Sequence, residues 1–262
     1  MLKDITIGQY FPGNSLVHKL DPRVKISLTV LYIVALFLLS GAISYVLATL
    51  FVVAVIKNSK ISAKLIIKSL KPLIFIIAFT SILNIFYTDG TPLVQIGFLK
   101  VTYEGLTLAF FMVWRIILLI AGSSLLTYTT SPILLTDGIE HLLSPFKKFK
   151  FPVHEFSMMM TIALRFIPTL IDETEKIINA QKARGADFES GNLVKRAKAL
   201  VPILIPLFIS SFRRADELAV AMECRLYQGG EGRTRLRVLK FEKSDYYTSI
   251  GSIIFFVIMV II

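Results

Sequence analysis

Long apolar runs limit the folds open to this chain more than any other feature of its sequence. Four runs have 15 residues and one has 24: Ile26–Ser40, Ala42–Ile56, Leu73–Tyr87, Gly105–Tyr128 and Thr248–Ile262. A helix needs about 20 residues to cross the hydrocarbon core of a bilayer, so the shorter runs need flanking residues to span it. The pattern predicts an all-α integral membrane protein with about five transmembrane helices.

The composition excludes two other classes of protein. Hydrophobic residues make up 55 % of the chain and charged residues 18 %, with a mean hydropathy of +0.70. An average soluble domain is about 45–50 % apolar and about 25 % charged. Cys224 is the only cysteine, which excludes a scaffold held by intrachain disulfides. The apolar content also excludes an intrinsically disordered chain.

The first two apolar runs are separated by a single residue, Gly41. One continuous helix over 26–56 would be about 46 Å long, which exceeds a hydrocarbon core of about 30 Å. Gly41 therefore predicts a hairpin between two short spans.

Basic residues are distributed unequally among the segments that connect the runs. Five lysines lie in the loop 57–71, whereas the Gly41 hairpin carries no charge and 88–104 has one lysine against two acidic residues. The positive-inside rule then predicts that the N-terminus, the loop 57–71 and residues 129–245 are cytoplasmic. The last span would leave the C-terminus outside.

The charged residues, whose net charge is +11, are concentrated in one part of the chain. Between Arg165 and Lys240 there are 14 basic and 9 acidic residues, which is 23 of the 47 charged residues. These residues lie beside long apolar segments, which is not typical of a nucleic-acid-binding protein. They indicate a surface that faces anionic lipid or a protein partner, and we expect no nucleic-acid partner.

The polar middle of the chain predicts a cytoplasmic domain of three long amphipathic helices. The predicted division is an N-terminal membrane domain over 1–128, this domain over 129–243 and a fifth transmembrane helix over 244–262. Pro168, Pro202 and Pro206 lie inside the predicted helices and are expected to kink them.

The last two of these helices end in the same pattern of a small residue, an arginine and a residue that stops the helix. The two motifs are Ala183-Arg184-Gly185 and Cys224-Arg225-Leu226, with the arginines 41 residues apart. The helix dipole alone favours an arginine at a C-terminus, so a simple capping charge is one interpretation. The other is that each guanidinium binds a carboxylate or carbonyl groups of a partner. Two copies of the motif suit a partner with two similar subunits.

The N-terminal segment adds a further motif to these two. It reads Gly8-Gln9-Tyr10, Pro12-Gly13-Asn14-Ser15, His18 and Leu20-Asp21-Pro22-Arg23-Val24-Lys25. With this segment, the topology and the arginine motifs, essentially the whole chain resembles the transmembrane (T) components of energy-coupling factor vitamin transporters. Ala183-Arg184-Gly185 matches the first X-Arg-X motif of that family. Cys224-Arg225-Leu226 matches the second in position and in its arginine, with different flanking residues.

The resemblance implies a non-catalytic subunit of an ABC transporter in a bacterial plasma membrane. Two ABC-type ATPase subunits, which bind ATP and Mg, would bind the helix ends at Arg184 and Arg225. Residues 129–243 would be the coupling domain, and a small membrane substrate-binding (S) component would bind a vitamin or similar micronutrient. No cofactor is expected in this chain, which lacks the Gly-x4-Gly-Lys-Ser/Thr loop of an ATPase.

Arg115 is an ionisable residue near the middle of the fourth apolar run. Charges inside a membrane are expensive and often functional, so Arg115 is a candidate contact with a membrane partner. A polar partner within this chain is the equally plausible alternative.

No catalytic or metal-binding residues are expected. The acidic group Asp172, Glu173 and Glu175 has no histidine or nucleophile beside it, and the three histidines lack metal-ligand spacing. Two alternative functions remain open, a self-sufficient permease and a membrane-embedded enzyme. A permease usually shows internal repeats or interrupted spans, and an enzyme needs a catalytic cluster.

Overall fold

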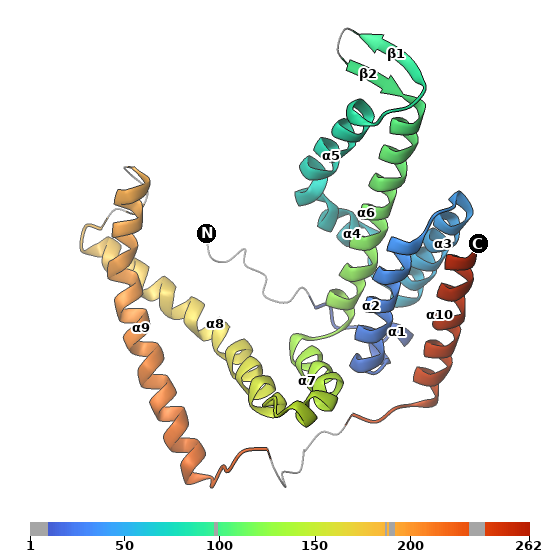
Figure 1. Cartoon of the computed structure of the whole chain (residues 1–262). Coiled ribbons are helices and arrows are strands. Elements are labelled where there is room, and N and C mark those ends of the chain that lie inside the picture. Colours follow the sequence, from blue (N-terminus) through green and yellow to red (C-terminus); the bar gives the residue numbers. More distant parts are fainter. Residues whose placement is uncertain (1–9, 97–98, 187, 189–191, 231–238) are drawn as a thin grey trace. The chain divides into compact units, whose positions relative to one another are not determined.

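The computed structural model describes residues 10–96, 99–186, 188, 192–230 and 239–262. Gly8 and Gln9 of the N-terminal motif lie outside these residues. The described residues form two compact units (Figure 1). We call residues 10–141 with 239–262 the membrane unit, and residues 142–230 the arm unit.

The membrane unit contains the apolar helices and a β-hairpin. Its elements are α1 (Leu16–Lys19), α2 (Pro22–Leu38), α3 (Ala42–Ser59), α4 (Ala63–Leu70), the 3-10 turn η2 (Lys71–Leu73), α5 (Ile74–Tyr87), β1 (Pro92–Ile96), β2 (Leu99–Thr102), α6 (Tyr103–Thr129), most of α7 (Pro132–Leu143) and α10 (Lys243–Ile261). Gly41 is the N-cap of α3 and joins it to α2, as the sequence predicts.

Among the described residues, four helical stretches are long and apolar enough to cross a membrane. They are α3, the stretch Ala63–Tyr87 formed by α4, η2 and α5, then α6 and α10. The remaining predicted span corresponds to α2, which has 17 residues. The prediction of an all-α membrane protein is confirmed, because all five apolar runs are helical.

Two connecting segments are more regular than the sequence predicts. The basic loop 57–71 contains α4, and the segment between α5 and α6 forms the antiparallel hairpin of β1 and β2. The base of the hairpin is tied to α6, since the backbone N–H of Thr91 donates to Glu104 over 2.8 Å. The Thr102 hydroxyl accepts from the Gly105 N–H and caps the start of α6.

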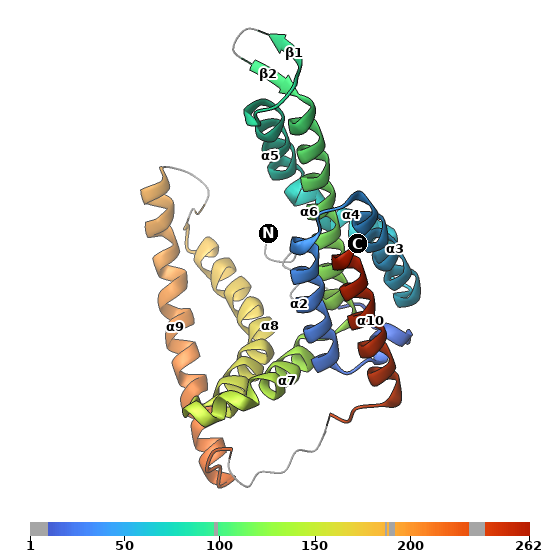
Figure 2. The same cartoon turned by 45° about the vertical axis from the view of Figure 1, so that its right-hand side comes forward.

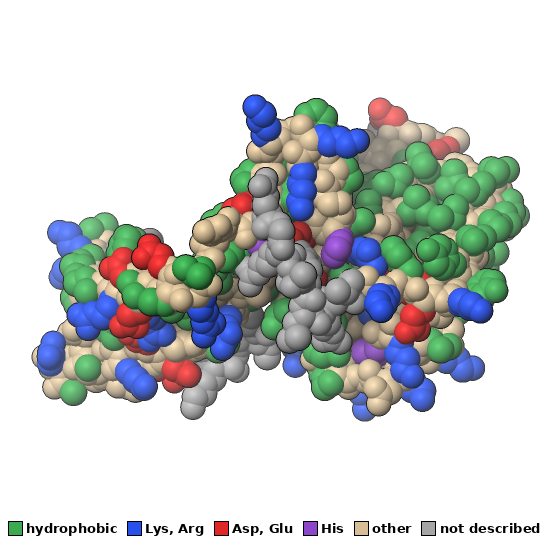
Figure 3. Space-filling view, turned by 90° about the horizontal axis from the view of Figure 1, so that it is seen from below, with side chains coloured by type: hydrophobic (Ala, Val, Ile, Leu, Met, Phe, Trp, Pro, Cys, Tyr) green, Lys and Arg blue, Asp and Glu red, His purple; other side chains and the backbone are tan. Residues whose placement is uncertain are grey.

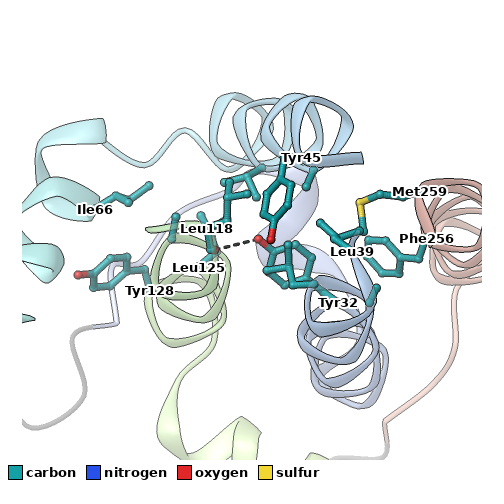
Figure 4. Close-up of a cluster of buried hydrophobic side chains, with 14 residues drawn as sticks. Tyr32, Leu39, Tyr45, Ile66, Leu118, Leu125, Tyr128, Phe256 and Met259 are labelled. Carbon is teal, nitrogen blue, oxygen red and sulfur yellow. Dashed lines mark hydrogen bonds between the residues drawn. The ribbon is translucent and has the colours of Figure 1, made fainter. Parts of the chain in front are cut away.

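The core of the membrane unit lies among α2, α3, α6 and α10 (Figure 4). The Tyr32 hydroxyl donates to the Leu118 carbonyl over 2.8 Å, while the Tyr32 ring packs with Phe51 and Phe256. Gly122 makes this packing possible, because a Cβ at that position would lie 2.2 Å from the Tyr32 ring. The aromatic residues of three apolar runs thus fill one core.

A polar cluster joins the N-terminal ends of α2 and α10. The Asp21 carboxylate accepts from the backbone and side chain of Arg23, and the Asp21 N–H donates to Asp245 over 2.9 Å. The Arg23 guanidinium also stacks on Phe241, 3.9 Å from the ring centroid. Burial raises the pKa of Asp21, but the hydrogen bonds and charge of Arg23 outweigh burial and lower it below the usual 3.8.

The arm unit consists of two long helices and the shorter elements before them. The 3-10 turn η3 (Ser144–Phe149) precedes α8 (Val153–Ala183), and α9 (Leu193–Cys224) follows. Helices α8 and α9 end at Ala183 and Cys224, so each ends at one of the two arginine motifs as predicted, and all three prolines lie inside them. Figure 2 shows the two helices from a second side. The chain passes from one compact unit to the other near residues 141 and 238. The domain boundaries predicted from the sequence are at 128 and 243.

The two long helices run in opposite directions. Glu173 of α8 hydrogen-bonds to Ser210 and Arg214 of α9, while Gln181, further along α8, reaches the carbonyl of Pro202, earlier in α9. The C-terminal ends of α8 and α9 therefore lie at opposite ends of the pair. Acidic and basic side chains are mixed over the surface of the arm unit in the space-filling view (Figure 3).

Candidate functional site

The end of α8 is closed by a Schellman motif around Gly185. The Gly185 N–H donates to the Lys182 carbonyl and the Ala186 N–H to the Gln181 carbonyl, each over 3.0 Å. Gly185 has a φ of +86°, in the left-handed region that this motif requires at the residue after the cap. Arg184 is therefore held in the capping position, one residue before the turn.

The end of α9 has the same backbone arrangement. The Leu226 N–H donates to the Glu223 carbonyl over 2.8 Å, and the Tyr227 N–H donates to the Met222 carbonyl over 3.0 Å. Arg225 is the capping residue, with φ −93° and ψ 10°, against φ −87° and ψ 7° for Arg184. The similarity of the two sequence motifs thus extends to the dihedral angles and hydrogen bonds.

Both arginine side chains are exposed. Within the described part of the chain, neither guanidinium group has a recorded hydrogen bond or ion pair. Ala183 and Cys224, which precede the arginines, are exposed as well. Each helix end therefore offers a planar fork of N–H donors suited to a carboxylate or to backbone carbonyls of a partner.

The two arginines are far apart within the arm unit. From the contact of Glu173 with Ser210, Arg184 lies 11 residues along α8 and Arg225 lies 15 residues along α9. At a rise of 1.5 Å per residue these are about 16 Å and about 22 Å, in opposite directions. A single small ligand cannot contact both ends, whereas two separate protein surfaces can.

Two glycines after α9 lie where the chain passes the start of α8. Gly229 has a φ of +93°, and a Cβ on Gly230 would lie 2.6 Å from the His154 ring. Glycine at both positions lets the chain turn back and pass closely over α8.

Leu226 differs from its counterpart Gly185 in a way that opposes folding. Leucine at a φ of +54° is strained, because its Cβ approaches the following carbonyl, at a cost of about 1–2 kcal/mol. Its side chain is 82 % exposed, so packing within the described residues does not offset this cost.

Arg115 has partners inside the membrane unit. Its Nε donates to the Tyr45 hydroxyl over 2.9 Å, and its Nη2 donates to the Leu39 carbonyl over 3.0 Å. Leu39 caps α2, so the guanidinium satisfies a carbonyl that the helix itself leaves free. The structure thus supplies the internal partner that the sequence leaves as an alternative, and a contact with another membrane protein stays a prediction.

One residue of the acidic group on α8 contacts α9, which the sequence does not predict. Glu173 pairs with Arg214 and Ser210 of α9, whereas Asp172 is exposed. The opposite charges of the two helices were the available signal, but only the antiparallel pairing shows which residues meet. Among the described residues, no three His, Cys, Asp or Glu side chains could together hold a metal ion.

The comparisons with known proteins agree on one family. The family model described as cobalt transport protein (CbiQ) matches residues 13–236. The energy-coupling factor transporter transmembrane protein EcfT of Ruminiclostridium cellulolyticum is 56 % identical over 255 residues, covering 97 % of this chain and 96 % of the relative. The EcfT proteins of Clostridium kluyveri and Bacillus subtilis are 57 % and 50 % identical, covering 97 % and 94 % of this chain and 95 % and 93 % of the relatives.

These matches define a membrane component of a transporter. The chain belongs to the cobalt transport protein (CbiQ) family and, within it, to the EcfT transmembrane components of energy-coupling factor transporters.

Proposed function

We propose that this chain is the coupling subunit of an energy-coupling factor ABC transporter. Two ABC-type ATPase subunits bind the α8 and α9 ends, and a separate small membrane S component binds the substrate. The observation that carries this proposal is the closely similar capping geometry of Arg184 and Arg225. Two equivalent, separated binding ends are what a partner with two similar subunits requires.

The helix pair also supports a mechanical role. The helices α8 and α9 have 31 and 32 residues and are joined at Glu173, well away from either arginine. When ATP binding brings the two ATPase subunits together, each subunit displaces one helix end. The helices carry that displacement into the rest of the arm unit, and so to the S component.

The distribution of charge supports one orientation in the bacterial plasma membrane. The lysines at 57, 60, 64, 68 and 71 are exposed, and the segment 142–230 contains 22 of the 47 charged residues of the chain. With these segments on the cytoplasmic side, the N-terminus is cytoplasmic and the arginines face the compartment that contains ATP.

The chemistry of this proposal lies in the partners. The ATPase subunits bind ATP and Mg and hydrolyse the nucleotide, so this chain needs no cofactor and no catalytic residue. The S component takes up a vitamin or similar micronutrient. The lipid bilayer is the remaining partner, and no nucleic acid takes part.

Charge reversal at the two helix ends tests the proposal. Wild-type chain and the Arg184→Glu, Arg225→Glu and double variants are co-expressed with the ATPases and purified in mild detergent. Each single variant is expected to weaken ATPase binding and the double variant to abolish it, since close interfacial charge pairs are worth about 1.5–7 kcal/mol. The Lys176→Glu variant is a matched control, because Lys176 is an exposed charge on α8 away from its end.

Retention of both ATPases by a folded double variant would refute the role of the arginines. If the chain alone, in liposomes, took up substrate without ATPases, the alternative of a self-sufficient permease would replace the coupling role.

A further inference from the structure

The short segment that joins α7 to α8 exposes three phenylalanine side chains. Phe149 is 81 % exposed, Phe146 51 % and Phe151 45 %. The rings lie in pairs, with 6.2 Å between the centroids of Phe146 and Phe149 and 6.1 Å between those of Phe151 and Phe156. Single apolar side chains on a surface need no explanation, whereas a cluster of them indicates an interaction site.

Three lysines are interspersed with these rings. The sequence reads Phe146-Lys147-Lys148-Phe149-Lys150-Phe151, and we call this segment the aromatic–basic turn. All three lysines are exposed, and none of them forms an ion pair with another described residue. Residues 141–154 include no Asp or Glu. The turn therefore combines exposed apolar surface with positive charge that no neighbouring carboxylate neutralises.

Backbone hydrogen bonds give the aromatic–basic turn a defined shape. Side chains three residues apart lie on the same side of a 3-10 helix, which places Phe146 and Phe149 together on one side of η3. The Lys150 N–H donates to the Lys147 carbonyl over 3.0 Å, and the Val153 N–H donates to the Phe151 carbonyl over 2.8 Å. The rings and lysines thus form a surface that exists before any partner binds.

The aromatic–basic turn is close along the chain to the start of an apolar helix. It follows α7, and a Cβ on Gly138 of α7 would lie 3.0 Å from Ile26 and 3.2 Å from Pro22, both in the first turns of α2. Only eight residues separate Gly138 from Phe146, which limits how far the turn can lie from α2. The headgroups of the lipids around α2 are therefore within its reach.

We propose that the aromatic–basic turn is a lipid-binding site. Its phenylalanine rings enter the interface of the bilayer, and its lysines bind the headgroups of anionic phospholipids. Apolar residues beside lysines are the combination by which surface segments bind an anionic membrane. Each lysine near such a membrane strengthens the attraction roughly fivefold. Lysine is depleted at interfaces between proteins, which favours lipid over an acidic protein surface as the partner.

A lipid contact at this place adds an attachment point at the start of α8. The inference takes from the proposed function only the placement of residues 142–230 on the cytoplasmic side. It does not involve the arginines at the ends of α8 and α9, so the two proposals can fail separately.

The test uses the full-length chain in nanodiscs, with one tryptophan as a probe of contact with lipid. Trp114→Phe removes the only native tryptophan, and Phe149→Trp then places an indole in the aromatic–basic turn. The nanodiscs contain equal amounts of phosphatidylcholine and phosphatidylglycerol. One of the two lipids carries bromine on its acyl chains, which quenches tryptophan fluorescence on contact. Both are expected to quench, brominated phosphatidylglycerol about twofold more strongly than brominated phosphatidylcholine.

Two further variants in the Trp114→Phe background serve as controls. Leu226→Trp places the indole at a position of the arm unit that is 82 % exposed, close to the value for Phe149, and should show no quenching. A triple variant combines Phe149→Trp with neutral lysine replacements, Lys147→Gln, Lys148→Gln and Lys150→Gln. It is expected to lose the preference for phosphatidylglycerol and to stay folded, because these lysines are exposed.

Two results would overturn the inference. Equal quenching by the two brominated lipids in the Phe149→Trp protein would show that the lysines do not select anionic headgroups. Absence of quenching by either lipid would show that the rings do not enter the bilayer. In that case, loss of co-purifying ATPase subunits from a Phe149→Asp variant would assign the surface to a protein partner. Both leaflets of the nanodisc have the same composition, so the result does not depend on the proposed orientation.

Discussion

Arg184 and Arg225 occupy the same position in two helix ends whose hydrogen bonds correspond residue by residue. The same carbonyls, three and five residues back, accept bonds at each end, and the capping dihedral angles agree within a few degrees. Because α8 and α9 run in opposite directions, this shared geometry appears at two separate places in the arm unit. One chain thus carries two equivalent arginines at separate helix ends, which the proposed function assigns to two binding partners.

Glycine is needed at position 185 because of the backbone conformation there, and not because a side chain would clash with a neighbour. No atom would lie within 4 Å of a Cβ at Gly185, yet its φ is +86°. We expect Gly185→Ala to destabilise the end of α8 by about 1 kcal/mol, measured as faster amide hydrogen exchange at Ala186. Gly251→Ala is the matched control, since Gly251 has the same open surroundings inside α10 and should tolerate alanine. Equal effects of the two substitutions would contradict this reasoning.

Arg115 should contribute to the stability of the membrane unit. Arg115→Met leaves the Tyr45 hydroxyl and the Leu39 carbonyl without this donor, at a cost of about 2 kcal/mol. Tyr45→Phe removes one of the two bonds and should cost less. The effects of the two substitutions should not add, because the residues are in direct contact. The unfolding midpoints of both single variants and the double variant in detergent provide the measurement, and full additivity would argue against the contact.

Glu173 should be needed for transport more than for assembly. Glu173→Gln removes the ion pair with Arg214 that joins α8 to α9 and leaves both helix ends intact. We expect ATPase co-purification to persist while ATP-driven uptake falls several-fold, because the two helices no longer move together. Asp172→Asn is a suitable control, since Asp172 is an exposed neighbour. Normal uptake by the Glu173→Gln protein would show that the pair does not transmit motion.

The Asp21 cluster should make stability depend on acidic pH. Since the pKa of Asp21 is lower in the folded protein than its usual 3.8, its ionised form stabilises the fold above that pH. This stabilisation is lost as the pH falls through the lowered value. The gap in unfolding midpoint between the wild type and Asp21→Asn should therefore be present at pH 6 and shrink as the pH falls below 3.8. A gap that is unchanged at low pH would show that the carboxylate charge is not involved.

The sequence predicts the helices well because hydrophobic periodicity and charge carry that information locally. The apolar runs, the Gly41 hairpin and the bounds of α8 and α9 follow from patterns within about 30 residues. The hairpin of β1 and β2 is not among the predicted elements, because the sequence analysis treats 88–104 only as a connection between two spans.

Contacts between distant segments could not be obtained in this way. The pairing of Glu173 with Arg214, the partners of Arg115 and the link from Asp21 to Asp245 all join residues 41 or more positions apart. The strain at Leu226 could not be predicted from the sequence for another reason. A helix stop is predicted equally by glycine or by a polar residue, and only the backbone angles show that leucine occupies the left-handed position.

The composition of the purified complex tests the central claim most directly. The tagged full-length chain is isolated in mild detergent, and its partners are identified and counted by native mass spectrometry. The account predicts one copy of this chain with two ATPase subunits and one small apolar membrane protein. Isolation of the folded chain alone, with substrate uptake in liposomes that contain no ATPase, would contradict it.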